Sequence, residues 1–324
     1  MEPKLKTIGV LTSGGDAPGM NAAIRAVVRK AIGNGMQVKG ICQGYKGLLN
    51  EDFIDLDARA VSDTIGKGGT MLRTARCEEF LREEVQKEAA EICRSHGIEG
   101  IVVIGGDGSY RGALSLAKQG IATVGVPGTI DLDIACTEYT IGFDTAVNTA
   151  MEAIDKVRDT SHSHERCSII EVMGRDAGYI ALWCGIANGA EDILLPEVYD
   201  YDEQKLINNI INNRKRGKNL HIIINAEGIG HSTSMARRIE AATGVETRAT
   251  ILGYMQRGGS PTCRDRVAGS MMGAYAADLL AEGKSNRVVA FVNGQYVDYD
   301  IFEALAMQKD LPDYMVRVSK ALSI

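Results

Sequence analysis

Aromatic residues, paired cysteines and long apolar runs are all scarce in this chain of 324 residues. Phe, Trp and Tyr make up only 5% of it, which disfavours the stacking surface of a single-strand nucleic-acid binder. No apolar stretch of about eighteen residues occurs, and the amino terminus shows no signal core, so we expect neither a membrane span nor secretion. The 7 cysteines are odd in number and form no CxxC pair, which argues against a disulfide frame or a zinc site.

Positive charge is also in short supply. The chain has 36 Lys and Arg residues against 42 Asp and Glu residues, for a net charge of −6. Such a balance disfavours nucleic acid and anionic membranes as partners. The 5 histidines form no HExxH motif or other metal-ligand spacing. We therefore expect a cytoplasmic protein that acts on small molecules.

Glycine, by contrast, is abundant, with 37 residues, and short apolar runs alternate with helical patterns. We expect strands near 7–12, 38–43, 101–104, 122–126, 168–173, 220–225 and 247–252. We expect helices near 21–32, 84–95, 146–160, 179–188, 203–213, 235–243 and 266–282. Such βα alternation predicts an α/β fold with mainly parallel, doubly wound sheets, in which ligands gather at the carboxyl ends of the strands. No Pro- or Ser-rich linker separates the two lobes that this length suggests, so they should be closely joined.

Two of the expected strands end in a Gly-Gly-Asp sequence, at Gly14–Asp16 and Gly105–Asp107. Glycines let backbone N–H groups approach phosphate oxygens, and a helix N-terminus attracts phosphate. The alternatives are a tight structural turn at the first loop and a helix-capping acid at Asp107. The rarer string, Gly105–Ser109, favours function, with Asp107 as a Mg²⁺ ligand.

A third strand ends in Pro-Gly-Thr-Ile-Asp-Leu-Asp, residues 127–133. In extended backbone the spacing of Asp131 and Asp133 would put both carboxylates on one face, close to Asp107. One could accept a proton from a hydroxyl while the other orients a metal or lines the pocket. The alternative is an exposed acidic turn, but Leu132 argues for a partly buried loop. Together the three loops indicate phosphoryl transfer.

Arginines stand beside further glycine turns, in Met173–Gly178 and in Gln256–Pro261. Arginine binds phosphate oxygens in a bidentate manner, although a single surface arginine is more often in an ion pair. The basic run Asn212–Lys218 should end a helix, where cations complement the helix dipole, and by itself it indicates only a solvated helix end.

In this order, the strings IGVLTSGGDAPGMNAAIR, VVIGGDGSYRGA, GTIDLDIACTEYTIGFDTA, DTSHSHER, EVMGRDAGY and ETRATILGYMQRGGSP resemble the ATP-dependent 6-phosphofructokinases of the bacterial type. The resemblance covers nearly the whole chain and is weakest after about Asn293. It implies two doubly wound lobes with the active site between them. The ATP-binding lobe would comprise 1–142 plus about 257–306, and the fructose-6-phosphate-binding lobe 143–256 plus about 307–324.

The resemblance also implies the reaction: the γ-phosphoryl group of ATP, with Mg²⁺, passes to the 1-hydroxyl of fructose 6-phosphate, the committed step of glycolysis. Catalysis would fall to Asp131 as general base, with Thr129, Arg76 and Arg175. Nucleotide contacts would be Gly15, Tyr45, Arg76, Cys77, Gly106, Asp107, Gly108, Ser109 and Gly112, with Asp107 also the metal ligand. Contacts to the sugar phosphate would be Thr129, Asp131, Asp133, Arg166, Met173, Gly174, Arg175, Glu227, Arg248, Tyr254 and Arg257.

In the family, the residues matched by Arg166 and Arg248 reach the site from a neighbouring subunit, which implies a homotetramer. An effector site for ADP or phosphoenolpyruvate between subunits would use Arg25, Arg29, Arg158, Glu191, Arg216 and Lys218. That site gives the basic run at 212–218 a second possible role.

The chain departs from the family at three places. Leu132 replaces the usual Asn between the two acids, and Tyr254 replaces the usual His. In the effector site, Ala58 stands where better-known members have an arginine, and Leu220 replaces a polar residue. The effector site therefore departs from the family pattern at two positions.

Rival functions remain open. Pyrophosphate-dependent relatives have Asp and Lys where this chain has Gly108 and Gly128, and an Asp side chain would crowd the α-phosphate of ATP. Kinases of NAD or lipid head groups would lack the MGRDAG and QRGGSP strings. A kinase of tagatose 6-phosphate is a closer rival, and a catalytically silent regulatory subunit is a rival from a different class.

Overall fold

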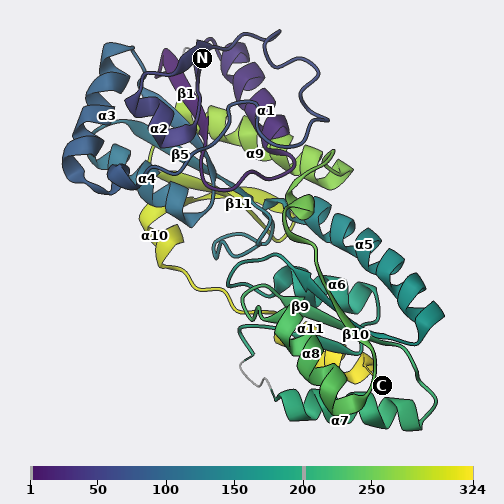
Figure 1. Cartoon of the computed structure of the whole chain (residues 1–324). Coiled ribbons are helices and arrows are strands. Elements are labelled where there is room, and N and C mark those ends of the chain that lie inside the picture. The colour runs from purple at the N-terminus through teal and green to yellow at the C-terminus, as the bar shows by residue number, and fades with distance from the viewer. Residues whose placement is uncertain (1–2, 199–201, 324) are drawn as a thin grey trace. The chain divides into compact units, whose positions relative to one another are not determined.

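The computed structural model describes residues 3–198 and 202–323 (Figure 1). Its strands are β1 Thr7–Thr12, β2 Gln37–Ile41, β3 Phe53–Asp55, β4 Gly100–Gly105, β5 Ala122–Thr129, β6 Ile141–Gly142, β7 Cys167–Val172, β8 Asp192–Leu194, β9 His221–Ala226, β10 Thr247–Ile251, β11 Arg287–Val292 and β12 Gln295–Asp300. Its α-helices are α1 Met20–Gly33, α2 Gly44–Leu49, α3 Glu83–Ser95, α4 Asp107–Lys118, α5 Phe143–His164, α6 Tyr179–Ala187, α7 Glu203–Lys215, α8 Ser232–Thr243, α9 Cys263–Ala281, α10 Ile301–Ala306 and α11 Asp313–Leu322. Two 3-10 helices are η1 Glu78–Leu81 and η2 Gly253–Arg257. The predicted α/β class with mainly parallel sheets is confirmed.

Backbone contacts divide the chain into two compact units. The eight-stranded unit comprises Met1–Ile130, Ile134–Thr145 and Arg257–Lys309, and the four-stranded unit comprises Asp131–Asp133, Ala146–Gln256 and Asp310–Ile324. Which substrate each unit binds stays a prediction. Within the described ranges no helix has the length and apolar character needed to cross a membrane.

The larger sheet runs in the order β12-β11-β5-β4-β1-β2-β3, with β6 paired to β5. Strands β1, β2, β4, β5 and β11 are parallel neighbours, and β3 and β12 are antiparallel edges. Every residue of β4 is buried, as expected for a parallel strand that is covered on both faces. Helices α1 and α9 lie together along one face, while α2, α3 and α4 form a separate group in Figure 1.

Small residues let α1 and α9 pack closely. A Cβ built on Gly273 would lie 2.5 Å from the carbonyl oxygen of Ala23, and one on Gly269 would lie 2.8 Å from that of Gly19. Only glycine permits such an approach of two helix backbones. The close packing fixes the start of α1, and with it the loop that precedes this helix.

The smaller sheet is fully parallel, in the order β10-β7-β9-β8. All six residues of its central strand β9 are buried. A cluster from Cys167 to Val245 fills one side, where α7 and α8 pack. The helices and strands expected from the sequence are confirmed, whereas the sequence reading missed several elements, among them β6, β8, α4 and α11.

Candidate active site

Three loops meet at the carboxyl-terminal end of the eight-stranded sheet, where the central strands β1, β4 and β5 end. This row of strand ends is called the carboxyl edge of a sheet, and the row of strand starts its amino edge. The strands are parallel and in register, with Thr12 opposite Ile104 and Gly105 opposite Pro127. A Cβ built on Gly14 would lie 3.6 Å from Ser109 Oγ, and one on Gly105 would overlap both that hydroxyl and the carbonyl oxygen of Ser13. The first two glycine loops are therefore in contact, as their placement after parallel strands predicts.

Helix α4 begins inside the second loop. Gly106 is its N-cap and half-buried Asp107 is its first residue, so the loop places a helix N-terminus, which attracts anions, at the end of β4. A Cβ at Gly106 or Gly108 would meet no atom within 4 Å. The loop thus leaves open space above the start of the helix, which is what a bound phosphate chain requires.

Tyr45 borders this loop from α2. Its hydroxyl donates a 2.6 Å hydrogen bond to the carbonyl oxygen of Ser109, and its ring fills the space where Gly112 has no side chain. The ring also stacks on Phe80 at 4.3 Å, and burial raises the pKa of its hydroxyl. Tyr45 is thereby held as a fixed wall and not as a titrating group.

The segment that carries Arg76 and Cys77 is tied to the same edge. Thr12 Oγ1 donates to the carbonyl oxygen of Arg73 at 2.9 Å, and Thr74 Oγ1 donates to that of Gly14 at 2.8 Å. The Arg76 side chain is exposed, and burial raises the pKa of the half-buried Cys77 thiol. An exposed guanidinium on a loop that is anchored to Gly14 is suited to binding a phosphate.

The loop after β5 corrects one expectation. The strand ends at Thr129, and Leu132 has a φ of 59°, so the backbone from Asp131 to Asp133 is not extended. The argument that their spacing puts both carboxylates on one face is therefore wrong. Leu132 is only 5% exposed, which confirms the expectation of a partly buried loop. The closeness of Asp107 to these two acids stays a prediction.

A leucine in the left-handed region also explains the departure from the family pattern. Asn adopts this conformation more readily than other residues with a Cβ, whereas leucine pays about 1–2 kcal/mol for it. The usual Asn is therefore the better residue for this backbone. Here burial of the leucine side chain offsets the strain, and strain of this kind often marks a functional loop.

Arg257 lies against the first glycine loop. Its guanidinium occupies the space that a side chain at Gly15 would take, and its Nε lies 3.3 Å from the carbonyl oxygen and 3.7 Å from the carboxylate of Asp16. The structure thus groups Arg257 with the eight-stranded unit, while Arg166, Arg248 and exposed Tyr254 belong to the four-stranded unit.

In the four-stranded unit, Met173, Gly174 and Arg175 follow the carboxyl end of β7, and Glu227 follows that of β9. The Arg175 N–H donates to Glu227 Oε1 at 2.5 Å, which brings the two loops together. Arg175 has a φ of 56°, so its backbone is strained like that of Leu132, whereas the φ of 140° at Gly174 is one that glycine adopts readily. The Arg175 side chain is 81% exposed and directed to solvent.

Arg166 and Arg248 lie at the opposite edge of this sheet. Arg166 directly precedes β7, Arg248 is the second residue of β10, and the two strands start side by side. Both guanidinium groups bind Glu246, each at 2.7 Å. Arg166 and then Arg248 hold the pKa of the Glu246 carboxyl below its ordinary value. The two arginines are thus brought together by a carboxylate that the sequence reading missed.

Several predicted effector residues gather at this amino edge. Buried Glu191 directly precedes β8, binds Lys218 Nζ at 3.0 Å and accepts the N–H of Ile222 at 2.6 Å. Arg158 donates to the carbonyl oxygen of Asn188 and, at 3.2 Å, to that of Gly189. Arg25 and Arg29 are on α1 of the eight-stranded unit, where Arg29 lies 3.4 Å from the carbonyl oxygen of Ala58.

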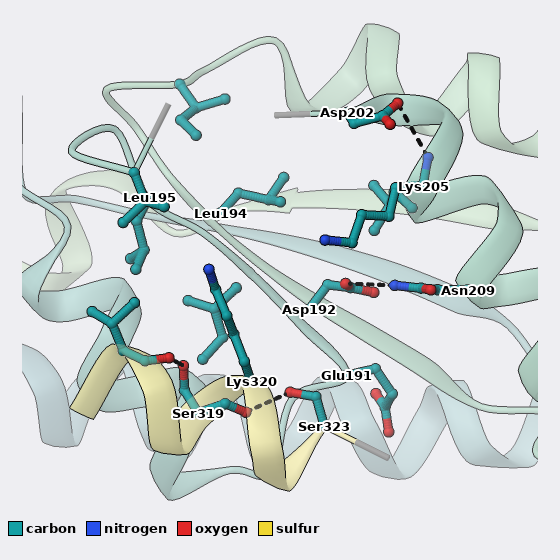
Figure 2. A pocket seen from close by; sticks show the side chains of 15 residues that line it. Glu191, Asp192, Leu194, Leu195, Asp202, Lys205, Asn209, Ser319, Lys320 and Ser323 are labelled. Carbon is teal, nitrogen blue, oxygen red and sulfur yellow. Dashed lines mark hydrogen bonds between the residues drawn. The ribbon is translucent and has the colours of Figure 1, made fainter. Parts of the chain in front are cut away.

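Two adjoining cavities open beside Glu191. The smaller, of about 200 Å³, is lined by Glu191 and Arg216 among others. The larger, of about 280 Å³, is shown in Figure 2, where Lys205 and Lys320 reach into it from α7 and α11. Both are lined by Glu191, Asp192, Asn209 and Ser323. Of the predicted effector residues, Glu191 and Arg216 therefore face space that could admit a ligand.

Two buried polar residues beside the predicted site also escaped the sequence reading. Gln256 is fully buried and its Oε1 lies 3.4 Å from the Met173 N–H, which ties η2 to the loop after β7. Asp265 is fully buried in the first turn of α9 and binds the segment that precedes α5. Their signal in the sequence was slight, because each is a single polar residue within a string assigned to other roles.

No group of three or more His, Cys, Asp or Glu side chains is arranged to hold a metal within residues 3–198 and 202–323. A Mg²⁺ ion does not require such a group, because it keeps several waters and shares phosphate oxygens as ligands. Asp107, with open space beside it, fits such a shared site.

The family model described as Phosphofructokinase matches residues 7–280 of the chain. A protein of Clostridium acetobutylicum named ATP-dependent 6-phosphofructokinase is 56% identical over 319 residues, which cover 98% of this chain and 100% of that protein.

Solved structures agree at the level of the fold. The phosphofructokinase of Saccharomyces cerevisiae superimposes with a TM-score of 0.84 and 32% identity over 98% of this chain, which spans 46% of the yeast chain. A pyrophosphate-dependent phosphofructokinase of Marinobacter aquaeolei gives a TM-score of 0.85 at 23% identity, covering 96% of this chain and 86% of that one. At that identity the likeness concerns the fold alone.

Proposed function

Because the chain belongs to the phosphofructokinase family, we propose that it transfers the γ-phosphoryl group of ATP to the 1-hydroxyl of fructose 6-phosphate. The observation that carries this proposal is the meeting of the two Gly-Gly-Asp loops and the Thr129 strand end at one edge of one sheet. The products would be ADP and fructose 1,6-bisphosphate, so the protein would be a phosphotransferase of glycolysis with an alcohol as acceptor.

The nucleotide would lie along the open glycines of the eight-stranded unit. The N-terminus of α4 would attract phosphate, and Asp107 would hold Mg²⁺ together with phosphate oxygens. That ion, when bound, would neutralise phosphate charge. The contacting residues would be Gly15, Tyr45, Arg76, Cys77, Gly106, Gly108, Ser109 and Gly112. The open space at Gly108 supports ATP over pyrophosphate as donor, because an Asp side chain there would take up this space.

Asp131 would accept the proton of the sugar 1-hydroxyl while the hydroxyl oxygen forms a bond to the γ-phosphorus. The bond from that phosphorus to the β-phosphate oxygen breaks in the same step, and ADP leaves. Arg76 and Arg175 would stabilise the negative charge on the transferring group, and Thr129 would position it. Such a reaction needs alignment and charge neutralisation more than covalent catalysis.

The sugar phosphate would be held by residues from both edges of the four-stranded sheet. Met173, Gly174 and Glu227 follow the carboxyl ends of their strands, whereas Arg166 and Arg248 lie at the amino ends. A strand of six residues spans about 20 Å, which is longer than a hexose phosphate. One copy of the sheet therefore cannot bring both sets to one ligand. This supports a site shared between copies in a homotetramer, completed by Asp133, Tyr254 and Arg257.

An effector, ADP or phosphoenolpyruvate, would bind at the amino edge of the smaller sheet. The cavities beside Glu191 and Arg216, together with the ion pair between Glu191 and Lys218, support this placement. Arg158 would contribute from the same chain, and Arg25 and Arg29 from this or a neighbouring copy. Ala58 and Leu220 depart from the family pattern at this site.

A coupled assay on the purified chain tests the proposal. We expect fructose 1,6-bisphosphate to form from fructose 6-phosphate and ATP with Mg²⁺. The rate should be higher with ATP than with pyrophosphate as donor, and higher with fructose 6-phosphate than with tagatose 6-phosphate as acceptor. Faster turnover with pyrophosphate or with tagatose 6-phosphate would contradict the donor or the acceptor, respectively. Failure to form any product would indicate a silent regulatory subunit. Titration of fructose 6-phosphate with and without ADP or phosphoenolpyruvate tests the effector site.

A further inference from the structure

Asp265 is a buried carboxylate that the proposed reaction does not use. It lies in the first turn of α9, after the N-cap Thr262, and is 0% exposed. A buried charge is costly unless several donors satisfy it, so such a residue needs an explanation. The explanation lies in what its donors hold in place.

Four donors surround the Asp265 carboxylate. The Tyr139 hydroxyl and the Gly142 N–H donate to Oδ1 at 2.5 and 2.7 Å. The Thr145 N–H and hydroxyl donate to Oδ2 at 2.8 and 2.5 Å. Burial raises the pKa of the carboxyl, although the four hydrogen bonds oppose that rise. Each oxygen thus accepts one main-chain and one side-chain donor, all from residues 139–145.

These donors belong to the segment that pairs with the end of β5. In β6, Ile141 lies opposite Gly128 and Gly142 opposite Thr129. Gly142 therefore binds Asp265 and also pairs with Thr129. Asp131 follows Thr129 by two residues. The carboxylate fixes the strand end from which the proposed general base departs.

Asp265 also packs against Gly19, the N-cap of α1 at the end of the first glycine loop. A Cβ on Gly19 would lie 3.3 Å from the Cβ of Asp265 and 3.2 Å from its carbonyl oxygen. Thr145 Oγ1 accepts the Thr262 N–H at 3.0 Å, which joins the chain after Arg257 to the start of α5. Asp265 therefore links β6, the start of α5 and the loop before α1.

We propose that Asp265 is a positioning residue for phosphoryl transfer, which acts through β6 on Thr129 and on Asp131. This inference rests on the proposed function, in which Asp131 is the general base. A displacement of about 1 Å at a reacting group can lower turnover by about a hundredfold. Loss of the Asp265 network should therefore reduce kcat, while substrate binding by other residues persists.

The same unit offers a matched control. Asp298 on β12 accepts the Tyr275 hydroxyl at 2.9 Å and binds Arg287, the first residue of β11. It is likewise a shielded carboxylate paired with a tyrosine. Arg287 pairs with Val124 near the start of β5, away from the strand end that carries Thr129. Asp298→Asn and Tyr275→Phe thus change a similar hydrogen bond between a tyrosine and a carboxylate, away from Thr129.

The experiment compares Asp265→Asn and Tyr139→Phe with these controls by melting temperature, kcat and the KM of each substrate. We expect kcat to fall by about a hundredfold in Asp265→Asn and less in Tyr139→Phe, with each KM within about threefold of wild type. The controls should lower the melting temperature but keep kcat within about twofold. Should Asp265→Asn not fold, Tyr139→Phe, which keeps the carboxylate and three donors, decides the matter by the same criteria. An equal loss of kcat in the controls, or a loss confined to melting temperature, would overturn the proposal.

A double variant separates positioning from general destabilisation. If Asp265 acts through Asp131, adding Asp265→Asn to Asp131→Asn should lower kcat by less than about threefold further. If the two substitutions instead lower kcat by the product of their separate effects, the positioning role of Asp265 is overturned, while Asp131 keeps its assignment as the base. Near-normal turnover of Asp131→Asn itself would instead overturn the base assignment, so the two failures are distinguishable.

Discussion

The two sheets of this protein use their edges differently. In the eight-stranded unit the glycine loops and the Thr129 strand end all follow carboxyl ends of strands, so they meet at one edge. In the four-stranded unit the predicted residues divide between the carboxyl edge, with Met173 and Glu227, and the amino edge, with Arg166 and Glu191. The first arrangement gathers its predicted residues in one place, whereas the second separates its predicted residues by about the length of a strand.

The largest expected effect lies at the loop that leaves the eight-stranded sheet. Asp131→Asn should lower kcat by at least about a thousandfold, because the amide cannot accept the hydroxyl proton. The KM for fructose 6-phosphate should change little, since binding depends mainly on other residues. Steady-state kinetics and direct measurement of sugar-phosphate binding test this. Near-normal turnover would remove Asp131 from the base role.

The split of the four-stranded sheet can be tested by mixing two variants. Arg175→Ala and Arg248→Ala change opposite edges, and each alone should be nearly inactive. If every site takes Arg175 from one copy and Arg248 from another, co-expressed variants should regain up to about a quarter of wild-type activity. No recovery in verified mixed oligomers would mean that both residues serve one site from one chain, or that one of them serves none.

Backbone strain at Leu132 gives a smaller effect, measured as stability. Leu132 and Leu195 are both 5% exposed, but only Leu132 has a positive φ. Leu195→Asn should cost about 2–5 kcal/mol through lost burial. Leu132→Asn should cost about 1–2 kcal/mol less, because Asn relieves strain in the left-handed region. Chemical denaturation of both variants tests this, and equal costs would contradict the argument from strain.

The smallest expected effect is the pH dependence of stability at Glu246. Its pKa is lowered from 4.5 by Arg166 and Arg248, so its contribution is present above that value and lost as pH falls through the lowered pKa. Glu246→Gln should therefore lower the melting temperature at neutral pH, and the difference from wild type should vanish in acid. A difference that persists unchanged in acid would show that the carboxylate charge is not its cause.

Particular residues show how far the sequence could predict the molecule. The alternation of apolar runs and glycine loops was sufficient for the α/β class and for the meeting of Gly14 with Ser109, because parallel strands bring their carboxyl ends together. The same reasoning failed at Asp131 and Asp133, where extended backbone was assumed and Leu132 turns the chain. The pairing of Arg166 and Arg248 with Glu246 depends on which strands are neighbours.

The sequence by itself determined the kinds of group available: glycines for phosphate, acids for a proton and a metal, arginines for charge, and the family that shares them. These follow from local chemistry and spacing. Only the tertiary structure decided which edge each group occupies, the left-handed turn at Leu132, and the burial of Asp265 against a segment more than a hundred residues earlier. The physical reason is that strand order and burial arise from long-range packing, which short motifs do not encode.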